Sequence, residues 1–66
     1  MNNVTACLPN YNTSMYIKPC IKYFLKSKFI NEIIISDDAS EHSDIQKLEE
    51  IVKELRKKTD KKIIIL

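Results

Sequence analysis

Two adjacent carboxylates and one aromatic ring are the side chains of this chain best suited to chemistry. Asp37 and Asp38 come directly after the apolar run 33–36, and Tyr11 comes shortly after another apolar run, 4–8. Carboxylates at the end of a buried strand are costly unless that end opens into a cleft. Ligands of open parallel sheets bind at the carboxyl ends of the strands. The acid pair therefore marks the predicted site.

Tyr11 and Asp38 together have the chemistry of a uridine pocket. A tyrosine ring offers a flat surface on which a base can stack. An ionised carboxylate only accepts hydrogen bonds, so it selects the N3–H of uracil over cytosine, which has no such donor. Two simpler interpretations remain open at this point. Tyr11 could be a loop aromatic that covers the core, and the acids could cap the next helix or face solvent.

Three short apolar runs predict strands, at residues 4–8, 33–36 and 63–66. The second run has no polar alternation, which is typical of a strand buried on both faces. Pro9 is expected to end the first strand, because proline cannot donate a hydrogen bond to the ladder.

Two stretches with helical spacing of apolar residues separate these runs. The first extends from Met15 to about Ser27, with Ser14 as the expected N-cap. The second follows Ser43 and Gln46, which match a capping box. We therefore expect two helices, each half-buried against the strands.

The predicted order is strand, helix, strand, helix, strand, which is an α/β fold. Short connections and right-handed crossovers give a three-stranded parallel sheet of order 3-2-1 with two helices packed on it. This is one mononucleotide-binding half of a doubly wound, Rossmann-like fold. Both polar turns, residues 10–14 and 37–40, then lie at the same edge of the sheet.

Composition excludes several classes of function. The chain has 66 residues, so we expect one domain at most, and its 11 basic and 9 acidic side chains do not favour a nucleic-acid partner. It contains no glycine, which excludes the glycine-rich phosphate loops. No apolar run approaches the length of a membrane span, and residues 1–3 do not resemble a signal peptide. A cytoplasmic location is the expectation.

The remaining reactive side chains lack the spacing of a site. Cys7 and Cys20 fit neither a zinc site nor a disulfide framework, and we expect both to be small buried hydrophobes. His42 near the acid pair has no metal-ligand spacing, so a solvated loop is expected there. The lysine-rich stretch 56–62 is expected to be a solvated helix end, with an anionic membrane surface as the alternative.

The strings 4–12 and 32–40 resemble the start of the family 2 glycosyltransferases of GT-A fold. In that family the first strand ends in a proline-x-tyrosine-asparagine turn, as residues 9–12 do here. The second strand ends in two aspartates, a glycine and a serine, and here Ala39 replaces the glycine. The resemblance covers essentially all 66 residues and implies one half of a nucleotide-sugar-binding domain.

The resemblance also implies roles for individual residues. Tyr11 matches the ring that stacks on the base, and Asp38 matches the carboxylate that accepts a hydrogen bond from the base. The backbone of Pro9 would belong to the pocket wall. Asn12 and Asp37 match positions that mainly shape the turn. These five residues form the expected substrate-binding set.

As a member of this family, the chain would bind a nucleotide sugar, most simply a UDP-sugar, for transfer of the sugar by the full-length enzyme. The family's Asp-x-Asp motif, which binds Mg or Mn, and its catalytic base both follow the third strand. We therefore expect residues 1–66 to be the incomplete N-terminal part of the domain, with no catalytic residue or metal ligand and no activity of its own. The full-length protein could associate peripherally with the inner face of the membrane.

The rival prediction is a non-catalytic α/β interaction module. The first strand would lie at an open edge of the sheet, and open edges recruit further strands. Such a module would pair with another chain, or with itself, through that edge.

Overall fold

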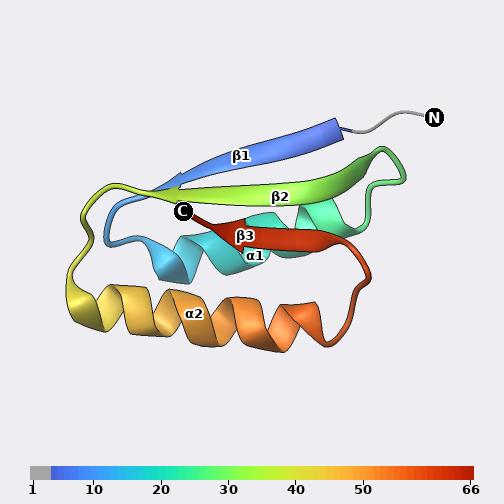
Figure 1. Ribbon diagram of the computed structural model, residues 1–66. Coiled ribbons are helices and arrows are strands. Elements are labelled where there is room, and N and C mark those ends of the chain that lie inside the picture. The colour runs from blue at the N-terminus through green and yellow to red at the C-terminus, as the bar shows by residue number, and fades with distance from the viewer. Residues whose placement is uncertain (1–3) are drawn as a thin grey trace.

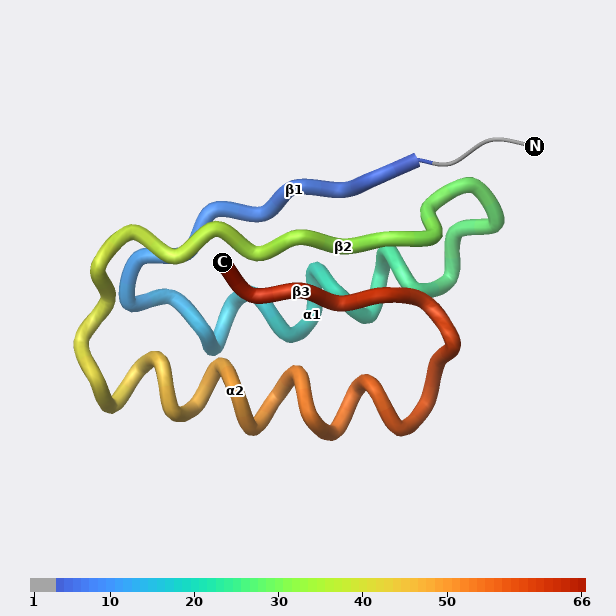
Figure 2. Tube along the Cα trace, viewed as in Figure 1, coloured from blue at the N-terminus to red at the C-terminus, as the bar shows by residue number. Residues whose placement is uncertain are grey.

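The computed structural model describes residues 4–66 and shows an α/β fold (Figures 1 and 2). The elements follow one another as β1 (Val4–Asn10), α1 (Ser14–Leu25), β2 (Ile30–Asp37), α2 (His42–Arg56) and β3 (Lys62–Ile65). The three strands are parallel, and their order in the sheet is β1-β2-β3. The predicted order of elements and the predicted strand order are therefore confirmed.

Both helices cover the same face of the sheet (Figure 1). On the central strand β2, Ile33 and Ile35 are fully buried, whereas Ile34 between them is only partly buried. Successive side chains of a strand point to opposite faces, so Ile34 belongs to the face that carries no helix. The prediction that this strand is buried on both faces is wrong, because the two helices lie on one side.

The hydrophobic core lies between this face and the two helices. α1, β2, α2 and β3 contribute branched aliphatic side chains at their own periods, every second residue in the strands and every third or fourth in the helices, and Ala6 and Leu8 of β1 pack against them. The buried members are Ile17, Ile21, Ile33, Ile35, Leu48, Val52, Leu55 and Ile63.

The first strand continues through Pro9 to Asn10, although Pro9 was expected to end it. Pro9 is opposite Ser36 of β2 in the parallel register. β1 is an edge strand, and an edge tolerates a proline because the missing N–H can face away from the ladder. The strand is therefore two residues longer than predicted, and Asn10 is its last residue, at the carboxyl edge of the sheet.

The two helices begin differently from the prediction. α1 includes Ser14, its cap position is Thr13, and the Thr13 side chain makes no cap hydrogen bond. α2 begins at His42, and the cap position is Glu41, again without a side-chain cap. The predicted N-caps at Ser14 and Ser43 are therefore wrong, and so is the loop assignment of His42.

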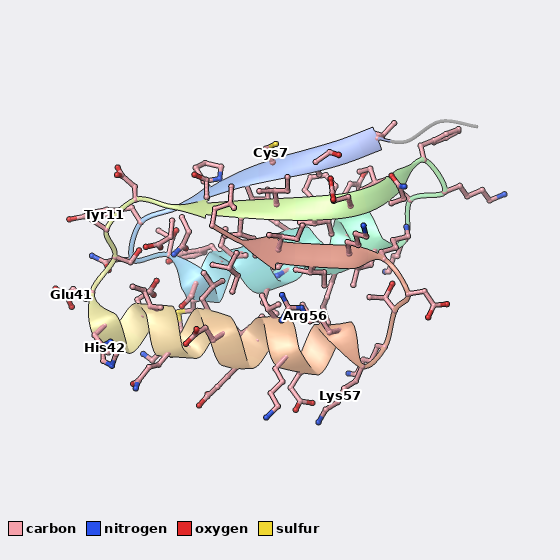
Figure 3. The ribbon with its side chains drawn as sticks, viewed as in Figure 1. Cys7, Tyr11, Glu41, His42, Arg56 and Lys57 are labelled. Carbon is pink, nitrogen blue, oxygen red and sulfur yellow. The ribbon has the colours of Figure 1, made fainter. Side chains whose placement is uncertain are left out.

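Both cysteines are free and exposed, so the prediction that they are buried is wrong. Cys7 alternates with Ala6 and Leu8, which pack against the core, and it therefore occupies the face without helices. Figure 3 shows Cys7 on that side of the sheet. Cys20 lies outside the buried stripe of α1 that contains Ile17 and Ile21.

Two side chains of the basic stretch 56–62 have structural contacts. The Arg56 guanidinium donates to the Ile63 carbonyl from Nε at 3.1 Å and from Nη2 at 2.5 Å. Lys61 Nζ donates to the carbonyl of Leu25 at 3.0 Å and to that of Ser27. Lys61, in the segment before β3, thus places a positive charge at the end of α1, where the helix carbonyls have no partner within the helix.

In the described part of the chain, neither helix combines the length and the apolar character that crossing a bilayer requires.

Candidate functional site

The loops that follow β1 and β2 meet at the carboxyl edge of the sheet (Figure 2). The Asp38 N–H donates to the Asn10 carbonyl at 2.9 Å, which extends the pairing of the two strands into the loops. The Asp37 N–H donates to the Leu66 carbonyl at 3.3 Å, so the end of the third strand joins the same edge. The sequence prediction that both polar turns share one edge is confirmed.

Asn10 is the centre of a hydrogen-bond network at this edge, and only 1% of its surface is exposed. Its Nδ2 donates to Asp37 Oδ1 at 2.8 Å, to Ser40 Oγ at 3.2 Å and to Asp44 Oδ2 at 3.1 Å. Its Oδ1 accepts from Thr13 Oγ1 at 3.0 Å. Since carboxylates only accept, an amide nitrogen is the group that can join two of them. We call Asn10, Asp37, Ser40 and Asp44 the inner network.

Asp37 closes the turn after β2. Its carboxylate accepts from Ser40 Oγ at 2.5 Å and from the Ser40 N–H at 3.0 Å, in addition to the bond from Asn10. The hydrogen bond from the Ser40 hydroxyl, then that from Asn10, hold the pKa of Asp37 below its ordinary value of 3.8. Asp37 is therefore ionised at neutral pH, and its oxygens accept the hydrogen bonds that close the turn.

Asp44 links the two helices. It lies in the first turn of α2, and its Oδ1 accepts from Ser14 Oγ at 2.7 Å and from the Ser14 N–H at 3.3 Å. The Ser14 hydroxyl is the main cause that lowers the pKa of Asp44, and Asn10 adds to it. The first turn of α1 contains no acid of its own, so Asp44 places a negative charge at that helix N-terminus from outside.

Asn12 connects the two loops directly. Its N–H donates to Ser40 Oγ at 2.9 Å, and its Oδ1 accepts from the Glu41 N–H at 2.7 Å. Asn12 has φ 52° and Ala39 has φ 55°, both in the left-handed region. Asparagine tolerates this conformation, whereas alanine pays about 1 kcal/mol for it. The turn after β2 therefore carries backbone strain at Ala39, which a glycine in this position would not have.

Tyr11 and Asp38 stay outside the inner network. Tyr11 is 61% exposed, so it does not cover the core, and Figure 3 shows it at the loop end of the sheet. Asp38 is also exposed, and its backbone N–H, bound to Asn10, fixes it beside the exit of β1. We call Tyr11 and Asp38 the outer pair. Pro9 is exposed on the strand just before them.

The sequence reasoning missed the structural roles of Asn10, Ser14, Ser40 and Asp44. One signal was available for Asn10. It follows Ala6 and Leu8 at a period of two, which places a polar side chain on the core face of the first strand. A polar group in that position must be hydrogen-bonded, and this predicts partners in the neighbouring loops.

The edge does not fit a metal ion. The carboxylates of Asp37 and Asp44 already accept hydrogen bonds from Asn10 and from serine hydroxyls. Within residues 4–66, no group of three or more His, Cys, Asp or Glu side chains is arranged to hold a metal. The Mg or Mn that the family resemblance implies would need ligands other than these.

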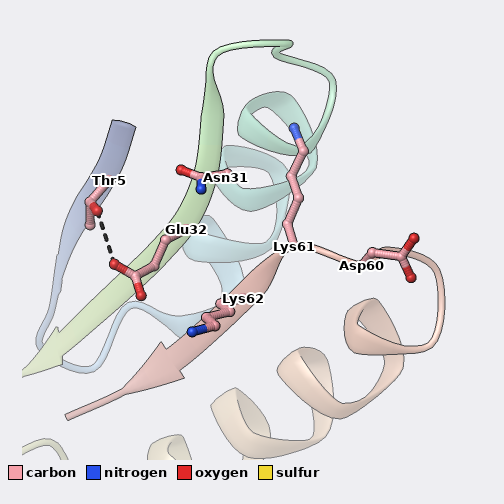
Figure 4. Close-up of a pocket in the computed structure, with 6 residues that line it drawn as sticks. All are labelled: Thr5, Asn31, Glu32, Asp60, Lys61 and Lys62. Carbon is pink, nitrogen blue, oxygen red and sulfur yellow. Dashed lines mark hydrogen bonds between the residues drawn. The ribbon is translucent and has the colours of Figure 1, made fainter. Parts of the chain in front are cut away.

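Two hollows flank the sheet ends. One of about 350 Å³ lies beside the inner network, lined by Ser14, Tyr16, Asp44 and Lys47 among others. Another of about 470 Å³ lies at the amino end of the strands, where Thr5 Oγ1 donates to Glu32 at 2.9 Å (Figure 4). Ligands of parallel sheets bind at the carboxyl end, so the second hollow is outside the candidate site.

Comparisons of the chain with protein-family models, with curated proteins and with solved structures found no match. The assignment of a function therefore rests on the geometry of the sheet edge and on the sequence motifs that produce it.

Proposed function

We propose that residues 1–66 form the base-binding part of a GT-A-type glycosyltransferase that uses a nucleotide sugar, most simply a UDP-sugar. One observation carries this proposal. Tyr11 and Asp38 are both exposed where β1 and β2 leave the sheet, and the 2.9 Å hydrogen bond from Asp38 N to the Asn10 carbonyl holds the two exits together.

The outer pair supplies the two contacts that a uracil ring needs. The Tyr11 ring offers a stacking surface, and the Asp38 carboxylate offers an acceptor for the N3–H of uracil. Asp37 is less suited to this role, because Asn10 and Ser40 already donate to its carboxylate. The pocket would therefore prefer uridine to cytidine, whose pairing edge has no N–H at that position.

In this proposal, residues 1–66 bind the base and the chemistry belongs to a later part of a longer protein. Sugar transfer from a nucleoside diphosphate needs a metal to stabilise the leaving group and a base to deprotonate the acceptor. Among residues 4–66 neither role has a candidate, since the carboxylates of Asp37 and Asp44 belong to the inner network.

The test is a titration of the 66-residue chain with UDP, followed by amide chemical shifts. We expect Asp38→Asn and Tyr11→Ala each to weaken binding about tenfold or more, since a charged hydrogen bond or a stacked base contributes roughly 1–3 kcal/mol. Asp60→Asn is the matched control, because Asp60 is an exposed acid beside the hollow at the other end of the sheet. Equal affinity of all variants, or equal binding of CDP, would contradict the proposal.

The second candidate is the interaction module, and the edge strand β1 favours it. β1 has seven residues and pairs with β2 on one side. An edge of this length can accept a further strand, although Pro9 removes one donor from it. Light scattering at rising concentration separates the candidates, because the module should self-associate and a base-binding domain should stay monomeric.

A further inference from the structure

The side of α1 that faces away from the core is unusually apolar. Tyr16 and Tyr23 are 71% and 75% exposed, on the side opposite the buried Ile17 and Ile21. Met15 on the same helix is 77% exposed. Single exposed apolar side chains are normal, but here they gather on one helix, and such a patch marks an interaction surface.

The same segment is positively charged and contains no acid. Residues 1–31 carry four lysines and no acidic side chain, whereas residues 32–66 carry seven basic and nine acidic side chains. The lysines, all exposed, are Lys18, Lys22, Lys26 and Lys28. A surface of one sign that includes aromatic rings complements a negatively charged partner.

A hollow of about 370 Å³ lies where α1 ends, and it combines both properties. Tyr23, Lys26, Lys28 and Phe29 are among its lining residues, and Phe29 is 65% exposed. The end of a helix normally repels anions. Here Lys61 Nζ donates to the carbonyl of Leu25, the last residue of α1, and to that of Ser27 in the loop after it, and so offsets that repulsion.

We propose that the outer face of α1 and the loop after it bind an anionic phospholipid surface. A lipid phosphate would lie between Lys26 and Lys28, and Tyr16, Tyr23 and Phe29 would enter the headgroup region. Tyrosine rings favour this boundary because they are apolar with one polar end, and lysines add attraction to anionic lipid. This surface is separate from the outer pair and does not depend on the proposed nucleotide binding.

A bilayer fits this surface better than an acidic protein does. The exposed rings and lysines are distributed along a 12-residue helix and its loop, and a helix lying flat on a membrane presents its side chains in this way. α2 provides the contrast. Its exposed side mixes Glu49, Glu50, Lys53 and Glu54, which neither concentrates positive charge nor carries an aromatic ring.

The first experiment is co-sedimentation of the 66-residue chain with vesicles. We expect binding to phosphatidylcholine vesicles with 30% phosphatidylglycerol, and little binding to phosphatidylcholine alone. Each lysine at an anionic surface strengthens binding about fivefold, so the triple change Lys22→Glu, Lys26→Glu, Lys28→Glu should weaken it about 100-fold or more. The control changes three exposed lysines, Lys47 and Lys53 of α2 and Lys58 just after it, to glutamate and should retain most of the binding.

Circular dichroism checks that both triple variants are folded. Absence of binding to the anionic vesicles, equal binding to neutral vesicles, or equal loss in the two triple variants would each overturn the proposal.

The two free cysteines give a second, independent readout, because both are exposed and they lie on different faces. Cys20 is on α1 between the two tyrosines, whereas Cys7 is on the sheet face without helices. With Cys7→Ser, we expect anionic vesicles to slow the reaction of Cys20 with an uncharged maleimide at least about fivefold. With Cys20→Ser, the reaction of Cys7 should be unchanged. Equal protection of both thiols, or protection of Cys7 alone, would overturn the assigned orientation.

Discussion

Asp37 and Asp38 are neighbours in the sequence, yet they belong to two different regions of the sheet edge. Asp37 is bound by Asn10 and Ser40 within the inner network, whereas Asp38 of the outer pair is exposed in the loop after β2. Asp37 is the last residue of β2 and follows the core-facing Ile33 and Ile35 at a period of two, whereas Asp38 already lies in the loop beyond the strand. One acid can therefore hold the loops while the next one remains accessible to a ligand. Substitutions in the inner network should lower the free energy of unfolding. Substitutions in the outer pair should weaken ligand binding and leave stability nearly unchanged.

The largest effect is expected for Asn10→Leu. A leucine of similar size donates no hydrogen bond, so two carboxylates and two hydroxyls lose their shared partner. Each lost hydrogen bond costs about 0.5–3 kcal/mol, and because Asp37, Ser40 and Asp44 keep other partners we expect a total loss of roughly 3 kcal/mol. A 66-residue domain has about 3–10 kcal/mol in total.

Urea denaturation measures this change in the free energy of unfolding. Ser36→Ala is the control, because Ser36 is exposed near the end of β2 and should change stability by less than about 0.5 kcal/mol. A stable Asn10→Leu variant would show that the inner network does not hold the edge.

The second effect is a loss of stability in acid. The pKa values of Asp37 and Asp44 are lowered in the folded state, so both carboxylates stabilise the fold above their ordinary value of 3.8. This stabilisation is lost as the pH falls from about 4 through the lower folded-state values. The urea concentration at the midpoint of unfolding should be constant from pH 7 to pH 5 and should decrease at pH values below 4.

The variant Asp37→Asn should show a weaker dependence over the same acid range, because it removes one of the two carboxylates whose pKa values are lowered. A pH dependence identical to that of the wild type would contradict a stabilising role for the ionised Asp37.

The third effect is a gain in stability from Ala39→Gly. Ala39 has φ 55°, and glycine adopts that conformation without the steric cost of a Cβ atom. We expect the free energy of unfolding to rise by about 0.5–1 kcal/mol. The control Ala6→Gly changes the same residue type inside β1 and should lower stability. A loss of stability in Ala39→Gly would contradict strain at this turn.

The smallest effect on stability is expected for the outer pair. Tyr11→Ala and Asp38→Asn remove exposed side chains, so each should change the free energy of unfolding by less than about 0.5 kcal/mol. The same denaturation experiment measures this. A large destabilisation by Tyr11→Ala would indicate that the ring packs structurally, and it would weaken the case for a base-binding role.

The sequence was sufficient for the order of elements and for the shared edge, because these follow from periodicity and from short connections between parallel strands. It was not sufficient for the caps. Ser14 matches a local capping pattern, but its hydroxyl donates to Asp44, which lies 30 residues away. Local patterns also could not show that both helices pack on the same face of the sheet. Because the other face has no helix, Cys7 is exposed and Ile34 is only partly buried.

The Lys61 ammonium links the end of α1 to the segment that leads into β3. It satisfies carbonyls at the end of α1, yet it arrives 36 residues later than Leu25 in the chain. The carbonyls of Leu25 and Ser27 therefore lack this donor until the last strand has docked. Detachment of the third strand should therefore favour fraying of the end of α1, because it removes a donor from these carbonyls.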